Sequence, residues 1–145
     1  LPGGGFLLFE PGRTLTAVDV NSGTAALDGA GRRGGERLIL EANLAAVPEI
    51  ARQLRLRNLG GIVVIDFIDM KAVPARRRVV EAMRAALADD PAPTQVGTMS
   101  RFGLVELTRR RRGASLAEML SRPCPTCGGS GRVRADSGAP PGGVA

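Results

Sequence analysis

Two apolar runs near the start of the chain predict a β-hairpin. The residues from Phe6 to Phe9 and from Leu15 to Val20 form strands readily, and Pro11-Gly12 between them suits a tight turn. Successive side chains of a strand point to opposite faces of the sheet, so Asp19 and Asn21 share one face. The hairpin therefore presents two polar side chains together at the end of its second strand.

Two later segments carry apolar residues at helical spacing. The first repeats them from Leu44 to Leu54, and Pro48 inside it predicts that the regular helix starts near Val47 or kinks there. The second opens on Pro74, a residue typical of a first helical turn, and Asp89-Asp90-Pro91 stops it. The polar and charged positions between the apolar ones are expected to face solvent.

Residues 60–70, between these helices, predict a buried strand that contains a carboxylate. Asp66 stands in an otherwise apolar run, and an ionised carboxylate in apolar surroundings is costly unless it is paired, hydrogen-bonded or bound to a metal. If this strand lies beside the one with Asp19 and Asn21, the three side chains offer hard oxygen ligands to one Mg²⁺. Asp69 falls on the opposite face by alternation and is interpreted as a strand-end cap or turn residue.

The remaining segments complete a mixed α/β pattern. Residues 95–100 and 102–108 predict short strands, and residues 115–120 predict a short helix. Residues 22–35 are rich in Gly, Ala and Arg and predict a loop directly after the metal candidate. The order β-β-α-β-α-β-β indicates an α/β fold, a mixed β-sheet with helices packed on it.

Composition supports one globular domain with a basic surface. The chain has 145 residues, 43% of them hydrophobic, and 20 basic against 14 acidic residues give a net charge of +6. Lys71 is the only lysine, and arginine binds phosphate with a two-pronged fork, so a nucleic-acid partner is one interpretation. A GC-rich genome would also enrich arginine. No apolar run reaches the roughly 20 residues of a membrane span, which predicts a cytoplasmic protein.

The two cysteines predict a metal site shared between two copies of the chain. Cys124 and Cys127 form a C-x-x-C knuckle followed by glycines, but zinc takes four ligands and the chain has no histidine. A second copy would complete a four-cysteine site across a two-fold interface, which predicts a dimer. Two alternatives stay open: half of a site whose other pair lies elsewhere, and a redox dithiol, which should sit at a helix start after a strand.

Several stretches together resemble the ribonuclease E/G family. They include Leu-Thr-Ala-Val-Asp-Val-Asn-Ser and Cys-Pro-Thr-Cys-Gly-Gly-Ser-Gly, and the similarity runs in register over about residues 1–134. The resemblance implies a DNase I-like catalytic subdomain over residues 1–112 and a linker with a zinc-link knuckle over residues 113–134. Residues 135–145 are Ala, Gly, Pro and Ser in the main and are expected to be disordered. We interpret the chain, which begins at Leu1, as a piece of a longer polypeptide.

The resemblance also implies a reaction and its residues. Asp19, Asn21 and Asp66 would bind a catalytic Mg²⁺, and the enzyme would hydrolyse single-stranded RNA to leave 5′-phosphate products. Structural Zn²⁺ held by the cysteine pairs would link two protomers, and two such dimers could associate further. Four arginines are candidates for RNA contacts, although charge runs are usually solvated faces: Arg32 and Arg33 in the predicted loop, Arg101, and Arg109 at the start of a basic run.

Two other functional classes fit the same residues. A non-catalytic RNA-binding module would explain the arginine excess and would bind RNA equally well without Mg²⁺. A structural dimerisation unit would bind zinc and form a dimer without affinity for RNA. The test that separates the endoribonuclease from both is whether Asp19 and Asp66 lie close enough to share one ion.

Overall fold

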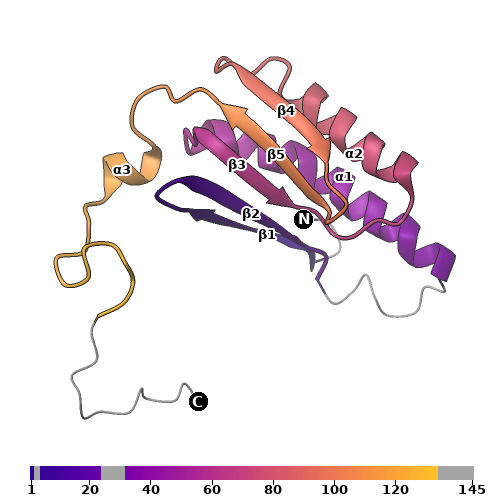
Figure 1. Ribbon diagram of the computed structural model, residues 1–145, viewed down its shortest axis with the longest axis horizontal. Coiled ribbons are helices and arrows are strands. Elements are labelled where there is room, and N and C mark those ends of the chain that lie inside the picture. Colours follow the sequence, from indigo (N-terminus) through magenta and orange to yellow (C-terminus); the bar gives the residue numbers. More distant parts are fainter. Residues whose placement is uncertain (2–3, 24–31, 134–145) are drawn as a thin grey trace, which may run out of the picture.

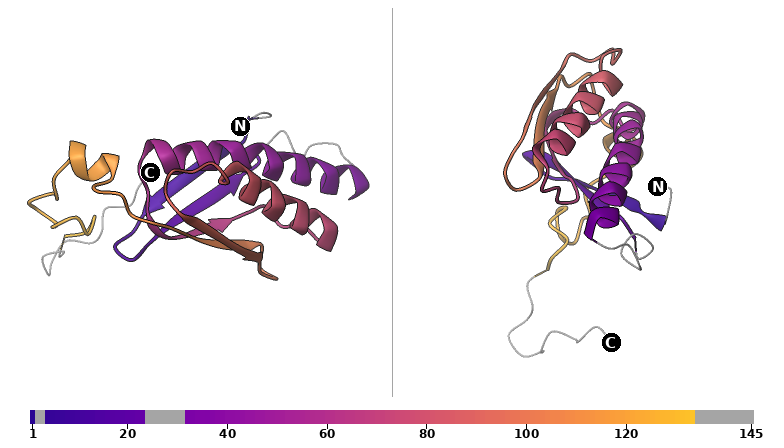
Figure 2. Two further views of the ribbon diagram at one scale, coloured as in Figure 1. Left: turned by 90° about the horizontal axis from the view of Figure 1, so that it is seen from above. Right: turned by 90° about the vertical axis from the view of Figure 1, so that its right-hand side faces the viewer.

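The computed structural model describes residue 1, residues 4–23 and residues 32–133, with the side chains of residues 32–34 left aside. It shows one five-stranded sheet with two long helices on the same side (Figure 1, Figure 2). The elements in chain order are β1 (Phe6–Pro11), β2 (Leu15–Asn21), α1 (Arg32–Leu56), β3 (Gly61–Asp66), α2 (Val73–Ala86), β4 (Thr94–Met99), β5 (Leu104–Arg109) and α3 (Leu116–Leu120). The mixed α/β fold expected from the sequence is confirmed.

The sheet order is β1-β2-β3-β5-β4, and only one neighbouring pair is parallel. β1 and β2 form the predicted antiparallel hairpin, and α1 connects β2 to the parallel strand β3. β5 runs antiparallel between β3 and β4. In consequence three features lie at the same end of the strands: the carboxyl end of β2, the carboxyl end of β3, and the turn between β4 and β5.

The two long helices bury one face of the sheet and leave the other open. The core between them holds fully buried side chains from both layers, such as Ile50 and Leu54 of α1, Val79 and Met83 of α2, and Ile65 of β3. On the open face Phe6 is 55% exposed and Ile62 is 50% exposed. The side chains of alternate strand residues therefore point to this open face.

Helix α1 begins earlier than the sequence predicted and passes through a proline. The predicted loop up to Gly35 overlaps α1, which starts at Arg32 and contains Pro48 in its interior, so the prediction that the regular helix starts near Val47 is wrong. Pro48 is exposed, so its ring meets solvent while Ile50 and other neighbours are buried. A long apolar contact with the sheet outweighs one missing backbone hydrogen bond, because packing supplies most helical stability in proteins.

Two predictions lie outside the described residues. Residues 24–31 of the expected loop and residues 135–145 of the expected tail belong to these parts. The side chains of Arg32 and Arg33 also lie outside the description, so their proposed contacts with RNA stay predictions. In the described ranges, no helix combines the length and the apolar character that a membrane span requires.

Asn58 ends α1 in a left-handed backbone conformation. Its φ is 49°, a region that asparagine tolerates better than most residues. The Leu59 N–H donates to the Leu54 carbonyl at 3.0 Å and the Asn58 N–H donates to the Arg55 carbonyl at 3.1 Å. This pair of bonds is the Schellman arrangement, which satisfies the last carbonyls of the helix and turns the chain into β3.

The side chain of Asn58 also holds the segment that leaves the sheet after β5. Its amide donates to the carbonyls of Arg112 and Ala114, at 2.9 Å each. A backbone bond from the Leu116 N–H to the Arg57 carbonyl, 3.0 Å long, adds a third link. These contacts set the direction in which α3 and the cysteines depart, and Figure 1 shows α3 lying apart from the sheet.

Arg109 is a buried structural residue. It is 4% exposed, and its Nε and Nη2 donate to the Asp90 carboxylate at 3.0 and 2.9 Å while Nη1 donates to the Leu59 carbonyl at 2.9 Å. The expectation that Arg109 contacts RNA is therefore wrong, because its guanidinium is used inside the fold. Burial alone would raise the pKa of Asp90, but bonds from Arg109 and the Ala92 amide, with the charge of Arg109, leave this pKa below its ordinary value.

Replacing Asp90 tests the importance of this buried ion pair. Asp90→Asn should lower the free energy of unfolding by about 3–5 kcal/mol, because it leaves the Arg109 charge buried without a partner. The lowered pKa of Asp90 also means that the pair stabilises the fold above the ordinary aspartate pKa and fades as the pH falls through the lowered value. Urea denaturation at several pH values measures both effects. Asp89→Asn, at the exposed neighbouring position, is the control, and equal stability of the two variants would contradict the account.

Replacing Asn58 separates its two roles. Asn58→Gly keeps a residue suited to positive φ but removes both side-chain bonds to the linker, so the sheet should keep its stability while the Leu116 amide exchanges faster with deuterium. Asn58→Ala should lose the cap as well, since alanine is strained at this φ. Unchanged protection of the Leu116 amide in Asn58→Gly would show that the side chain does not position the linker.

Candidate metal centre

Asp19 and Asp66 occupy facing positions on neighbouring parallel strands. The β2–β3 register pairs them directly, and strands that share hydrogen bonds lie about 4.8 Å apart. Both side chains are exposed on the open face of the sheet. Asn21 follows on the same face of β2, and its Nδ2 donates to Asp19 Oδ2 at 2.6 Å. The structure thus brings the three predicted residues together at the carboxyl ends of β2 and β3.

β3 is buried on one face only, contrary to the prediction from the sequence. The sequence predicted a strand buried on both faces, but β3 alternates: Val63 and Ile65 are buried under the helices, whereas Ile62 and Asp66 face the open side. Helices cover only one face of this sheet, so a polar residue on the other face does not have to be desolvated. Asp66 is therefore not forced by burial to bind a metal, and its position beside Asp19 becomes the stronger argument.

The surroundings of Asp66 still disfavour its charge. Its pKa is raised from the ordinary value first by partial burial, then by the charge of Asp19 and then by that of Asp69. The partial burial has a visible source, because the strand register places Leu8 beside Asp19 and Leu104 beside Asp66. Two carboxylates thus lie side by side between two apolar side chains, an arrangement that a bound cation would relieve.

Asp69 belongs to the same acidic region, which the alternation argument missed. β3 ends at Asp66, so the two-residue period of a strand does not extend to Asp69. A Cβ placed on Gly103 would lie 3.2 Å from Asp69 Oδ1, so this carboxylate reaches the turn between β4 and β5. Within residues 4–23 and 32–133, no three Asp, Glu, Cys or His side chains gather closely enough to hold a metal ion. Asp69 therefore adds negative charge, while the candidate ligands are Asp19, Asn21 and Asp66.

Asn43 is a buried positioning residue that sequence patterns did not indicate. Its side chain is fully buried, and its amide group donates from Nδ2 to the Ile68 carbonyl at 2.8 Å and accepts from the Ile68 N–H at Oδ1 at 3.0 Å. The backbone N–H and the carbonyl of Ile68, in the segment after β3, are thereby both bonded to α1. The segment that joins Asp66 to Asp69 is held by this contact, since it has no strand partner of its own.

The turn after β4 carries a cation and an exposed aromatic ring. Phe102 is 65% exposed, and the Arg101 guanidinium lies over its ring, 4.8 Å from the centroid. Ser100 Oγ accepts hydrogen bonds from the Phe102 and Leu104 amides at 3.2 and 3.3 Å, which stiffens the turn. The turn leads to Leu104, the register partner of Asp66, and the contact of Arg101 with RNA stays a prediction.

Cys124 and Cys127 lie in a run of turns beyond α3. The Gly128 N–H donates to the Cys124 carbonyl at 2.8 Å, and Cys124 is exposed. The pKa of the Cys124 thiol is lowered by hydrogen bonds from the backbone amides of Cys127 and Thr126. A thiolate that accepts amide bonds is suited to a metal, and the helix start expected for a redox dithiol does not follow Cys124.

Comparison with known proteins supplies the remaining observation, because residues 1–112 match the ribonuclease E/G family. The chain belongs to this family. It is 43% identical to ribonuclease E of Synechocystis sp., 46% identical to ribonuclease E of Escherichia coli and 44% identical to ribonuclease G of Escherichia coli, each over 92% of its length. It spans 19%, 12% and 27% of these three relatives, respectively, so it matches a minor part of each family member.

We expect the stability of the fold to increase when Mg²⁺ binds to the acidic pair, Asp19 and Asp66. The pKa of Asp66 is raised by partial burial and then by the charges of Asp19 and Asp69, so the cost of its ionised form in the metal-free fold grows as the pH rises through that pKa. Asp66→Asn should therefore raise the free energy of unfolding by about 0.2–1 kcal/mol in EDTA. Adding Mg²⁺ should stabilise the unmodified chain and not the variant.

The matched control for this measurement is Glu106→Gln. Glu106 is an exposed carboxylate on the same face, where its register partner on β3 is Val64 and not an acid. Thermal unfolding with and without Mg²⁺ should show the unmodified chain and Glu106→Gln gaining stability together. Equal stabilisation of all three proteins by Mg²⁺ would show that the ion acts elsewhere.

Proposed function

We propose that this chain is the metal-binding catalytic segment of an endoribonuclease that hydrolyses single-stranded RNA. The observation that carries the proposal is the direct pairing of Asp19 with Asp66 in a chain of the ribonuclease E/G family. Asn21 touches Asp19, so the residues offer two carboxylates and one amide oxygen to a cation. Magnesium prefers such oxygen ligands and keeps several of its waters, which a site on an open face allows.

Each residue of the site has a definite task in this proposal. Asp19 and Asp66 hold the cation and cancel its charge, while the hydrogen bond from Asn21 fixes the orientation of the Asp19 carboxylate. Mg²⁺ bound there would lower the pKa of a water molecule and polarise the scissile phosphate. A phosphorus–oxygen bond to water forms as the bond to the 3′ oxygen breaks, which leaves a 5′-phosphate and a 3′-hydroxyl. Arg101 offers a positive charge to a neighbouring phosphate.

We further propose that Cys124 and Cys127 hold Zn²⁺ together with the same pair from a second copy of the chain. Cys124, which is exposed and has a lowered thiol pKa, and Cys127, which is partly exposed, offer half of a tetrahedral site. A symmetric pair of chains completes it without further ligands. Association of two such dimers and a cytoplasmic location stay predictions of the sequence.

Cleavage of a single-stranded RNA with a 5′-monophosphate tests the catalytic proposal. Asp66→Asn should lower the cleavage rate about 100-fold or more, because the metal contributes several kcal/mol to stabilising the transition state. Glu106→Gln should cleave at the unmodified rate. Products with a 5′-phosphate should ligate directly to an acceptor RNA.

Two results would contradict the proposal in different ways. If the chain binds RNA equally well in EDTA and in Mg²⁺ but never cuts it, the chain is an RNA-binding module. If it binds zinc and dimerises but has no affinity for RNA, it is a dimerisation unit. A cleavage rate that Asp66→Asn leaves unchanged would place the catalytic residues elsewhere.

A further inference from the structure

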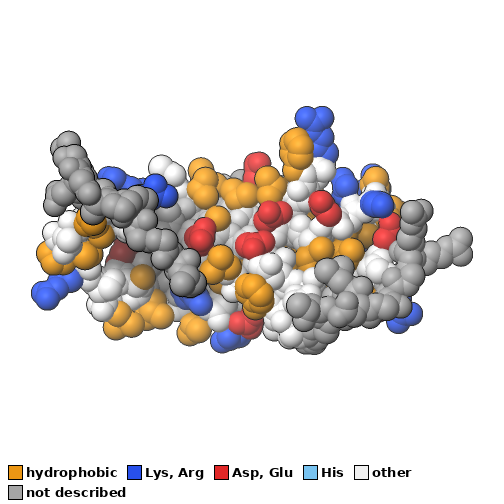
Figure 3. Space-filling view, turned by 90° about the horizontal axis from the view of Figure 1, so that it is seen from below, with side chains coloured by type: hydrophobic (Ala, Val, Ile, Leu, Met, Phe, Trp, Pro, Cys, Tyr) orange, Lys and Arg blue, Asp and Glu red, His pale blue; other side chains and the backbone are white. Residues whose placement is uncertain are grey.

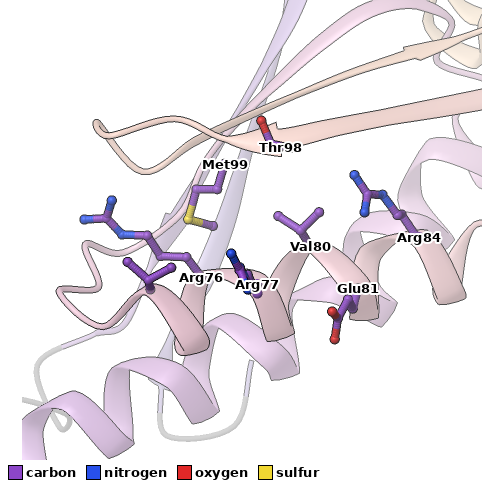
Figure 4. Close-up of a pocket in the computed structure, with 8 residues that line it drawn as sticks. Arg76, Arg77, Val80, Glu81, Arg84, Thr98 and Met99 are labelled. Carbon is purple, nitrogen blue, oxygen red and sulfur yellow. The ribbon is translucent and has the colours of Figure 1, made fainter.

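A groove of about 510 Å³ lies between α2 and the edge strand β4, away from the face that carries the acidic pair (Figure 4). Three arginines of α2 line it, and its apolar part comes from α2 and from the end of β4. The residues used below are Arg76, Arg77 and Arg84 for the charged part and Val80 and Met99 for the apolar part. The groove is not explained by the candidate metal centre.

The groove is positively charged. One carboxylate, that of Glu81, belongs to its lining residues, and in Figure 4 it points away from β4. Arg76 Nε donates to the Met70 carbonyl at 2.6 Å, which steadies that side chain while its terminal nitrogens remain available. Among the described residues, no side-chain hydrogen bond or ion pair uses Arg77, so its whole guanidinium is available to a ligand.

Arg84 occupies backbone hydrogen-bond acceptors of the edge strand β4, which disfavours binding of an extended peptide there. Its guanidinium donates to the carbonyls of Val96 and Gly97, at 3.3 and 3.1 Å from Nη2, so these backbone acceptors of the edge strand are already used. An extended peptide that added a strand to β4 would bond to carbonyls of alternate residues and would therefore compete with Arg84 for one of these two. The groove is thus better suited to a ligand that binds arginine side chains than to one that binds the sheet edge.

One end of the groove lies at the same level along the strands as the candidate metal centre, because Met99 of β4 and Ile65 of β3 are both paired with Val105 of β5. Met99 lines it and ends β4, and the turn that follows carries Arg101 and Phe102 and leads to Leu104, the register partner of Asp66. Val73, at the first turn of α2, is 58% exposed at the same end. Arginines are therefore found both in the turn after β4 and along α2, at the end of the strands where Asp66 lies.

We infer that this groove binds the phosphate backbone of a single-stranded RNA segment that extends from the metal centre. The inference rests on the proposed function, because it takes RNA as the substrate. Arginine forks match phosphate oxygens, and each neutralised phosphate of a single strand releases bound counterions. The apolar surface of Val80 and Met99 can lie against ribose or base.

Arg77 and Arg78 provide a matched pair for the test. Both are exposed arginines at adjacent positions of α2, but Arg77 lines the groove and Arg78 does not. Binding of a fluorescein-labelled single-stranded oligoribonucleotide is measured by fluorescence polarisation in EDTA, over a range of salt concentrations. Arg77→Ala should weaken binding about fivefold at 0.1 M salt and lower the salt slope by about 0.7, as expected for one lost phosphate contact, while Arg78→Ala should bind like the unmodified chain.

The outcomes distinguish this inference from the proposed function. Because the assay contains no metal and measures no cleavage, a selective loss in Arg77→Ala supports the groove even if the chain proves inactive. Equal losses in both variants would show a general effect of charge and overturn the inference. So would unchanged binding in Arg77→Ala, or displacement of the RNA by poly-glutamate from the unmodified chain but not from Arg77→Ala, which would indicate an acidic peptide ligand.

Discussion

The parallel pairing of β2 with β3 is the constraint on which the rest of this site depends. It places Asp19 against Asp66, and it exists because α1 carries the chain from the end of one strand back to the start of the other. The pairing is unfavourable by itself, since the charge of Asp19 adds to the cost that partial burial imposes on ionising Asp66. The pairing of two like charges is the reason why we propose a cation at this position.

The division of the sheet into a covered and an open face organises the charges of the molecule. Seen from the side of β1 and β2, Figure 3 shows Asp and Glu side chains in a band among hydrophobic ones, with most Lys and Arg side chains toward the margins. Glu10 and Glu106 share the open face with the acidic pair. An RNA phosphate would be repelled from the middle of this face unless a divalent ion is bound there. The positive side chains that could attract RNA therefore lie at the margins of this face and on α2.

The sequence predicted most elements because their apolar periods are regular. It located the hairpin, the β3 segment and α2, and the alternation of side chains correctly put Asp19 and Asn21 on one face. It failed where a tertiary contact decides the outcome. The burial of Asp66 depended on how many faces the helices cover, and the length of α1 depended on packing that tolerates Pro48.

The same limit explains the residues whose roles were missed or wrong. Arg109 belongs to a basic run in the sequence, but Asp90, 19 positions away, draws it into the core. Asn43 and Asn58 act through backbone groups 25 and 54 positions distant, respectively, and nothing in local composition marks such contacts. The role of Asp69 in the acidic region was missed because β3 ends at Asp66, so the alternation of strand side chains does not extend to Asp69.

The most direct test of the central claim is to locate a divalent ion in crystals of the chain soaked with Mn²⁺, which replaces Mg²⁺ and scatters anomalously. The account predicts one strong anomalous peak about 2.0–2.2 Å from carboxylate oxygens of both Asp19 and Asp66, with waters completing the coordination. A peak bound by Asp69 without Asp19, or the absence of any peak between β2 and β3, would contradict it.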